Sequence, residues 1–171
     1  KKIKENSRNG NSYNLQPTKF KVITNSREIK ELNVVSSGDF IIASPINIGK
    51  LEINMAGSGN ILLEKKVKLE INLASSGSVV ASNIDLAGIE CSLAGSGYIQ
   101  IAGKADRAEY NLAASGNIKA YECVTGKTEC NIAGSGNIQT HTRNQLEANI
   151  VGSGNVYYKG NPTTSKSIIG S

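Results

Sequence analysis

Glutamates recur in this chain at nearly regular intervals, and paired carboxylates are the groups that cleave glycosidic bonds in many hydrolases. Seven of the eleven glutamates belong to this row: Glu31, Glu52, Glu70, Glu90, Glu109, Glu129 and Glu147. Catalysis by two carboxyl groups requires surroundings that push their pKa values apart. Seven equivalent positions provide no such asymmetry, so the row predicts a repeated surface feature and no catalytic pair.

Basic residues accompany this glutamate row. Four of them precede a glutamate by two positions: Lys50, Lys68, Arg107 and Lys127. This spacing places both side chains on the same face of a strand, so we expect a solvated row of ion pairs. Catalysis and cation binding are the alternatives, although dedicated calcium solenoids carry dense aspartate and this chain has only three aspartates.

Few other residues could hold a metal or attack a substrate. His141 is the only histidine, which excludes a two-histidine metal site and leaves little general-base machinery. The three cysteines lack metal-site spacing and are too few for a disulfide scaffold. Cys91 and Cys130 occupy equivalent positions and are expected to fill the core, whereas Cys123 falls in a variable loop without a role. The sequence therefore predicts no catalytic residue, no metal and no cofactor.

A polar and aromatic group of side chains marks the C-terminal part of the chain. Its members are Lys119, Tyr121, Gln139, His141, Tyr157 and Lys159. Amphipathic rings beside hydrogen-bonding side chains suit the recognition of saccharides or peptides. These six residues form the predicted ligand-binding site, with an ordinary solvated edge as the alternative.

The elements that would position these residues follow from an internal repeat. Seven corners carry a serine, 18 to 21 residues apart: Ser37, Ser58, Ser76, Ser96, Ser115, Ser135 and Ser153. A glycine follows each one: Gly38, Gly59, Gly77, Gly97, Gly116, Gly136 and Gly154. A glycine in every copy predicts a structural corner that needs positive φ or a close backbone approach. A phosphate-binding loop would instead use a single glycine-rich turn that opens a helix.

Apolar residues alternate on both sides of each corner, which is the period of a β-strand. They stand three before and three after the serine, and asparagine stands four before it in six of the seven copies. Such repetition predicts stacked coils in which equivalent residues form ladders about 4.8 Å apart. The predicted fold is an all-β, single-stranded parallel β-helix, or solenoid, of about 20-residue units, with right-handed connections as the default.

Alternate corners differ in the residue before the serine, so one turn could consume one unit or two. We expect one unit per turn, since about 20 residues is a common coil length. Cys91 and Cys130 would then lie two strands apart, about 9.6 Å, which is too far for a disulfide. Two units per turn would make them neighbours.

The positive charge is concentrated at the N-terminus. The formal net charge is +5, and the first 30 residues carry +6, so a basic leader precedes a nearly neutral body. Nucleic acid is not expected as a partner. We divide the chain into an extended lead-in, residues 1–27, and a solenoid domain, residues 28–171. Because the early strands are apolar on both faces at Ile41, Leu62 and Val80, residues 10–27 or a second copy in a homo-oligomer should cover that outer face.

Three runs resemble a known family of corner repeats. They are AGSGNI at residues 56–61, AGSGNI at residues 133–138 and GSGNVYYKGNP at residues 152–162. These runs resemble the bacterial auto-transporter adhesin "head GIN" domain family, over about residues 28–171. The resemblance implies a β-helix superficially like pectin lyases, without their catalytic residues. It also implies an exported protein of Bacteroidetes-type bacteria with a role in adhesion.

These observations together predict a non-catalytic adhesion or binding module at the cell surface, associated with the outer membrane, or in the periplasm. The expected ligand is a glycan or a host or envelope protein. A carbohydrate-active enzyme of pectin-lyase type is the alternative, and a structural spacer or oligomer-forming stalk lies between the two. No apolar stretch approaches the ~20 residues of a membrane span, so no transmembrane segment is expected.

Overall fold

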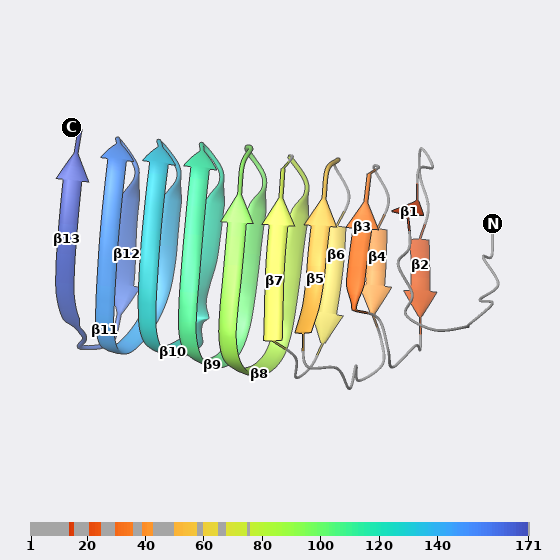
Figure 1. Ribbon diagram of the computed structural model, residues 1–171, viewed down its shortest axis with the longest axis horizontal. Helices are drawn as coiled ribbons and strands as arrows, with labels where there is room; N and C mark the ends of the chain where they lie inside the picture. The colour runs from red at the N-terminus through yellow and green to blue at the C-terminus, as the bar shows by residue number, and fades with distance from the viewer. Residues whose placement is uncertain are drawn as a thin grey trace.

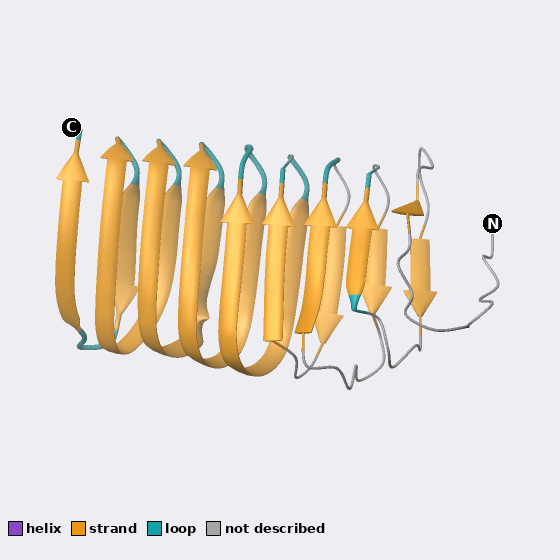
Figure 2. Cartoon of the chain, in the orientation of Figure 1, coloured by secondary structure: helices purple, strands orange, loops and turns teal. Residues whose placement is uncertain are grey.

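The computed structural model describes residues 14–15, 21–24, 30–35, 39–42, 50–57, 60–64, 68–74 and 76–170. All regular structure in these residues is β-strand, and Figure 2 shows the strands stacked in a row without a helix. Every pairing between them is parallel. The described chain is therefore an all-β parallel solenoid, which confirms the predicted fold class.

The stack has two layers, which Figure 1 shows as ascending strands in front and descending strands behind. The front layer contains β1 (Asn14–Leu15), β3 (Glu31–Val34), β5 (Lys50–Met55), β7 (Lys68–Leu73) and β13 (Thr163–Ile169). The back layer contains β2 (Lys21–Thr24), β4 (Asp39–Ile42), β6 (Asn60–Glu64) and β12 (Asn155–Lys159). Four longer strands begin in the back layer, bend and end in the front layer: β8 (Ser78–Leu93), β9 (Tyr98–Ala114), β10 (Asn117–Gly134) and β11 (Asn137–Gly152).

Equivalent residues of neighbouring turns pair with each other. Glu31 pairs with Glu52, and the later glutamates of the row pair in the same way. Cys91 pairs with Tyr110, and Tyr110 pairs with Cys130, so the two cysteines lie two strands apart. All three cysteines are free thiols. One repeat unit per turn is thus confirmed, and the alternative of two units per turn is wrong.

The coil is right-handed. In Figure 1 the chain advances from right to left while the front strands ascend and the back strands descend. An observer who looks along this direction of advance sees the chain turn clockwise. This is the hand expected when crossover connections join parallel strands.

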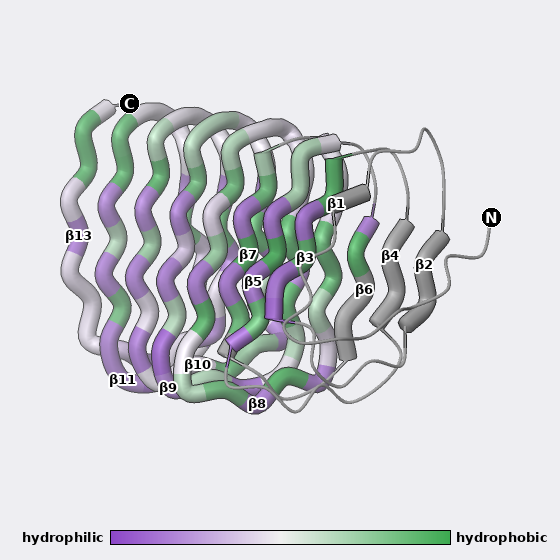
Figure 3. The backbone as a smooth tube through the Cα atoms, turned by 45° about the vertical axis from the view of Figure 1, so that its right-hand side comes forward, coloured by the Kyte–Doolittle hydropathy of each residue, from purple (hydrophilic) through white to green (hydrophobic). Residues whose placement is uncertain are grey.

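Side chains alternate between the interior and the outer face along each strand. In β5, Leu51, Ile53 and Met55 are buried, while Glu52 and Asn54 between them are half-buried. Figure 3 shows that hydrophilic positions of neighbouring turns line up in bands across the outside of the front layer. The buried positions form one continuous core between the two layers, as the strand period predicted.

The core becomes partly polar in the last turns, where four threonines are buried: Thr125, Thr128, Thr140 and Thr142. Thr128 Oγ1 lies 2.6 Å from Thr125 Oγ1 and 2.7 Å from Thr142 Oγ1. The Thr125 hydroxyl also donates to the carbonyl oxygen of His141 at 3.0 Å. These hydrogen bonds offset the cost of burying the hydroxyl groups.

The corner glycines are required by the close approach of successive turns. Five of them are buried: Gly77, Gly97, Gly116, Gly136 and Gly154. A Cβ on Gly136 would lie 2.2 Å from the carbonyl oxygen of Gly116, and a Cβ on Gly154 would lie 2.4 Å from that of Gly136. Of the two predicted reasons for these glycines, close backbone approach therefore applies. Gly38 and Gly59 lie outside the described residues.

Positive φ occurs at a different corner position, directly before the serine. Gly95, Gly134 and Gly152 have φ values of 156°, 141° and 122°. Ala114 occupies the equivalent place with φ of 149°, in a region that favours glycine. The sequence showed that alternate corners differ here, and the structure shows that the difference leaves a strained alanine in one turn.

The described part of the predicted lead-in belongs to the stack itself. β1 pairs with β3, and β2 pairs with β4, with Val22 opposite Phe40 and Ile23 opposite Ile41. For these strands, the prediction that residues 10–27 lie across the outer face is wrong, because their backbones extend the parallel ladder at its N-terminal edge. Residues 25–29, and with them the proposed boundary at residue 27, lie outside the described residues.

The apolar outer row of the early turns is continuous in the backbone. Ile41 pairs with Leu62, and Leu62 pairs with Val80. The Val80 side chain is half-buried, whereas the side chains of Ile41 and Leu62 lie outside the described part. A homo-oligomer through this row stays a prediction.

Candidate functional site

Five of the six predicted ligand-binding residues lie in two neighbouring rows of the back layer, on its last turns. Lys119 pairs with Gln139, and Gln139 pairs with Tyr157. His141 pairs with Lys159 two residues further along the same strands. With Tyr121, they make up what we call the tyrosine–lysine face: Lys119, Tyr121, Gln139, His141, Tyr157 and Lys159.

An irregularity in β10 positions Tyr121. The register of β10 against β11 shifts between Ala120 and Val124 and skips Tyr121. Lys159 Nζ lies 4.6 Å from the centroid of the Tyr121 ring and 3.6 Å from Glu122 Oε1. A cation–π contact and an ion pair thus connect β12 to β10 across the intervening strand.

Tyr98 joins this face, although the sequence alone did not single it out. Lys119 Nζ lies 4.8 Å from the centroid of its ring. Tyr98 stands two residues after its corner serine, where the following turns carry Asn117, Asn137 and Asn155. An aromatic residue in a row of asparagines was the signal that could have identified it.

The tyrosine–lysine face combines an exposed ring with a well-packed support. Tyr157 exposes 48% of its surface, whereas Tyr121, Gln139 and His141 are half-buried. Behind these side chains lies the buried threonine network, in which Thr140 Oγ1 is 3.3 Å from Thr142 Oγ1. Packing from below and fixed register along the stack hold the outward side chains in place, which lowers the entropy lost when a ligand binds.

The glutamate row on the front layer is held by cations and amides. Lys50 forms ion pairs with Glu52, at 3.8 Å, and with Glu70. The hydrogen bond to Glu70 raises the pKa of Lys50. Asn54 and Asn111 each donate from Nδ2 to the glutamate two residues earlier, at 2.9 Å. The predicted ion pairing is confirmed at Lys50, and the sequence did not indicate the asparagine partners.

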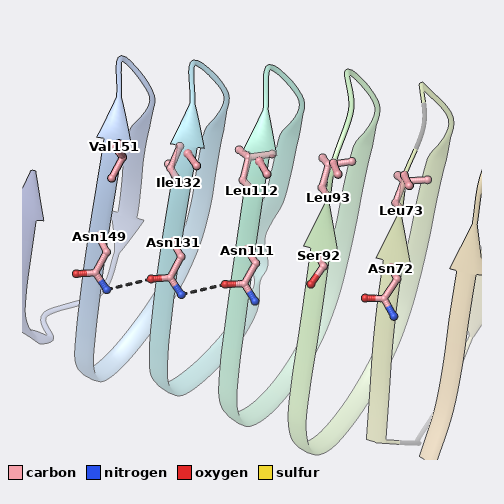
Figure 4. Close-up of a pocket in the computed structure, with 14 residues that line it drawn as sticks. Asn72, Leu73, Ser92, Leu93, Asn111, Leu112, Asn131, Ile132, Asn149 and Val151 are labelled. Atoms are coloured by element: carbon pink, nitrogen blue, oxygen red, sulfur yellow. Dashed lines mark hydrogen bonds between the residues drawn. The ribbon is translucent and has the colours of Figure 1, made fainter. Parts of the chain in front are cut away.

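Asparagines of the front layer form a ladder along the stack. It has two stretches, one joining Asn33, Asn54 and Asn72 and the other joining Asn111, Asn131 and Asn149. Within each stretch, Nδ2 of one amide donates to Oδ1 of the amide on the preceding turn, at 2.9 to 3.0 Å. Ser92 stands between the two stretches, as Figure 4 shows.

A shallow groove of about 420 Å³ runs beside this ladder from β7 to β11. Four alanines of one row line it: Ala74, Ala94, Ala113 and Ala133. Amides of the ladder and apolar side chains such as Leu93 and Leu112 also line it. The groove therefore offers a methyl surface bordered by amide groups.

The three cysteines surround a buried tyrosine inside the solenoid. Burial raises the pKa of Cys123 to about 11 and that of Cys130 to about 12. It also raises the pKa values of Cys91 and Tyr110 well above their usual range. Thiols that stay protonated are poor nucleophiles and poor metal ligands. Cys91 and Cys130 fill the core as predicted, whereas the expectation for Cys123 was wrong, because it is buried within β10.

Two absences hold for the described residues only. They contain no group of three or more His, Cys, Asp or Glu side chains that could hold a metal ion. They also contain no helix with the length and apolar composition needed to cross a membrane.

Comparisons with known proteins cover most of the chain. The family model described as "Putative auto-transporter adhesin, head GIN domain" matches residues 2–68 and 63–162, beginning within the predicted lead-in. A crystal structure described as a "putative adhesin from Parabacteroides distasonis ATCC 8503" is similar, with 29% sequence identity and a TM-score of 0.78. That match covers 83% of this chain and 61% of the other, so this chain spans less than two thirds of that relative. A search of curated proteins gave no match. The chain belongs to the auto-transporter adhesin, head GIN domain family.

Proposed function

We propose that this chain is a non-catalytic adhesion module of a bacterial cell surface or periplasm. Its ligand is a glycan or a host or envelope protein, and it binds through the tyrosine–lysine face. The observation that carries this proposal is the presentation of aromatic and cationic side chains from consecutive turns in fixed register. The family description and the description of the similar structure as an adhesin support it.

The chemistry of the face suits an extended ligand. Tyr157 offers an exposed ring for stacking, and Lys119 and Lys159 offer cations beside the rings of Tyr98 and Tyr121. Neighbouring strands of the face are about 4.8 Å apart, so these groups are presented at fixed steps. Weak contacts at each turn then sum along one ligand, and several copies of the module on one surface add avidity.

The glutamate row does not favour the alternative of a pectin-lyase-type enzyme. Catalytic carboxyl groups differ in environment, so that one is protonated while the other is ionised. Along this row, Glu52, Glu109 and Glu129 each accept a hydrogen bond from the asparagine two residues later. Such repeated, similar surroundings support a structural role for the row.

A double variant, Tyr121→Ala/Tyr157→Ala, tests the proposal. The purified chain is first screened against glycan and matrix-protein arrays, and its best ligand is then titrated by biolayer interferometry. We expect the double variant to keep the wild-type circular dichroism spectrum but to lose at least 10-fold in affinity. Gln145→Ala, at an exposed position of the front layer, is the matched control and should bind normally.

Two results would count against this function. Undiminished binding by the double variant would place the ligand site elsewhere on the molecule. Release of uronic acid from pectin by the wild-type chain, abolished by one glutamate substitution, would show that the chain is an enzyme.

A further inference from the structure

The break in the amide ladder at Ser92 leaves hydrogen-bonding groups without a protein partner among the described residues. In the backbone, Ser92 pairs with Asn72 on one side and with Asn111 on the other. Its side chain is too short to bridge them. Figure 4 shows the side chains of Asn72 and Asn111 on either side of the gap.

The unmatched groups are identified by comparison with an intact part of the ladder. Asn131 Nδ2 donates both to Glu129, at 3.1 Å, and to Asn111 Oδ1, at 2.9 Å. Asn111 Nδ2 donates to Glu109 only, so its second N–H has no partner among the described residues. In Figure 4 this nitrogen points toward the Ser92 turn.

The other side of the gap presents an acceptor. Asn72 donates from Nδ2 to Asn54, while its Oδ1 accepts no hydrogen bond from the described residues and points toward the Ser92 turn in Figure 4. Glu90, two residues before Ser92, is exposed and lacks the asparagine donor that Glu109 has. One N–H, one amide oxygen and one carboxylate therefore converge on a single turn.

The gap has the dimensions of one amide group. Neighbouring strands are about 4.8 Å apart, so the amides of Asn72 and Asn111 are separated by about 9.6 Å along the stack, with one ladder position between them. The groove lined by Ala94 and Ala113 opens beside this position. An external amide with its C=O toward Asn111 and its N–H toward Asn72 would complete the hydrogen-bond pattern.

We propose that this gap is a binding site for the acetamido group of an N-acetylated sugar. The acetamido oxygen accepts a hydrogen bond from Asn111 Nδ2, and the acetamido N–H donates to Asn72 Oδ1. The methyl group packs on Ala94. A ring hydroxyl donates to the Glu90 carboxylate. In a trans amide the N–H and C=O point in opposite directions, which matches a donor and an acceptor on opposite sides of the gap.

A sugar fits these groups better than an extended peptide does. A peptide would follow its first amide with a second one about 3.4 Å further along, over the methyl group of Ala94. A polar group covered there without a partner costs free energy. An acetamido group instead ends in a methyl at that place, and the sugar hydroxyls match the otherwise unused acceptor on Glu90.

Titration with defined oligosaccharides tests the site. The N-acetylglucosamine trisaccharide is compared with cellotriose, which has the same linkage but no acetamido groups, by isothermal calorimetry and by NMR of the Asn111 side-chain amide. We expect the N-acetylated trisaccharide to bind at least 10-fold more tightly and to shift the Asn111 NH2 resonances. Ser92→Asn fills the gap with the chain's own amide and should abolish this preference. Glu90→Gln should weaken binding about 3- to 10-fold.

The acetamido site lies on the front layer and the tyrosine–lysine face on the back layer. A result that refutes one proposal is therefore distinguishable from a result that refutes the other. Gln145→Ala, outside both sites, should leave binding of the N-acetylated trisaccharide unchanged, and the Asn111 NH2 resonances report on the front-layer site alone. Equal binding of cellotriose, or unchanged binding by Ser92→Asn, would overturn the proposal. Tighter binding of an acetylated, N-methylamidated tripeptide than of the trisaccharide would overturn it in favour of a peptide ligand.

Discussion

Replacing Ser92 with asparagine should make the solenoid more stable, because it joins the two stretches of the amide ladder. The new side chain would accept a hydrogen bond from Asn111, donate to Asn72 Oδ1 and donate to Glu90. The equivalent bonds elsewhere in the ladder are 2.9 to 3.1 Å long. Asparagine is already the residue at this place in the turns on both sides, so the backbone accommodates it.

The expected gain follows from the net value of such bonds. Each intramolecular hydrogen bond contributes about 0.5–1.5 kcal/mol after exchange with water. Holding one more side chain in a single rotamer costs up to about 1 kcal/mol. The three new bonds would be half-exposed, so each should lie in the lower half of that range, at about 0.5–1 kcal/mol. After the rotamer cost, the net increase in the free energy of unfolding is about 0.5–2 kcal/mol. For a chain of this size, each kcal/mol raises Tm by about 2–4 °C.

Urea unfolding followed by circular dichroism measures this change, with an unchanged m-value as evidence that the unfolding transition is the same. Ser92→Asp is the matched control, since aspartate has the shape of asparagine but no N–H to donate. It also places a charge beside Glu90, so it should give no gain or a loss. A Ser92→Asn variant no more stable than wild type, or an equal gain in Ser92→Asp, would refute the reasoning.

Three further predictions concern the corners and the buried thiols. Ala114→Gly should stabilise the chain by about 1 kcal/mol in urea titration. The reason is that relief of ~1–3 kcal/mol of backbone strain exceeds the ~0.5–1 kcal/mol entropic cost of glycine. The control Ala113→Gly lies outside the positive-φ position and should be destabilising. Gly136→Ala should cost at least about 2 kcal/mol, because its Cβ would lie 2.2 Å from a backbone oxygen, and an unchanged urea midpoint would contradict this. Burial raises the pKa values of Cys123 and Cys130 to about 11 and about 12 from the usual 9.0. The free energy of unfolding should therefore be unaffected by these thiols below pH 9 and should fall as the pH rises from 9 toward 11 and 12, where the thiols ionise only in the unfolded chain. In that pH range, each thiol should lower the free energy of unfolding by about 1.4 kcal/mol per pH unit. A Cys123→Ala/Cys130→Ala variant should lose less stability at alkaline pH in the same urea titration.

The fold and the register were predictable because only one register places the apolar residues of each strand in the core. A shift of one residue in β5 would move Glu52 into the core and Ile53 to the outside. The same argument holds in every turn, so the rows of the sequence become the rows of the structure. The predicted ligand-binding residues came together for this reason, with Lys119, Gln139 and Tyr157 in one row.

The features that escaped prediction depend on local geometry at the bends. Cys123, which was expected in a loop, lies where the register of β10 shifts, and a repeat pattern does not specify which residues are skipped at such a bulge. Tyr98 was missed because its significance arises from Lys119 on the next turn. The pairing of β2 with β4 was missed because no glycine corner in the sequence marks a preceding turn.

Because one repeat unit makes one turn, each unit adds about 4.8 Å to the length of the solenoid. Asn117 pairs with Asn137, so removing residues 117–136 would join Gly116 to Asn137 and bring Asn149 beside Asn111. The bands on the outer face would continue across the junction, and the stack would be shorter by one step. Loss of half a unit would instead exchange the layers for every later residue. The length of the molecule and the pattern on its surface can therefore vary independently, provided that units are gained or lost whole.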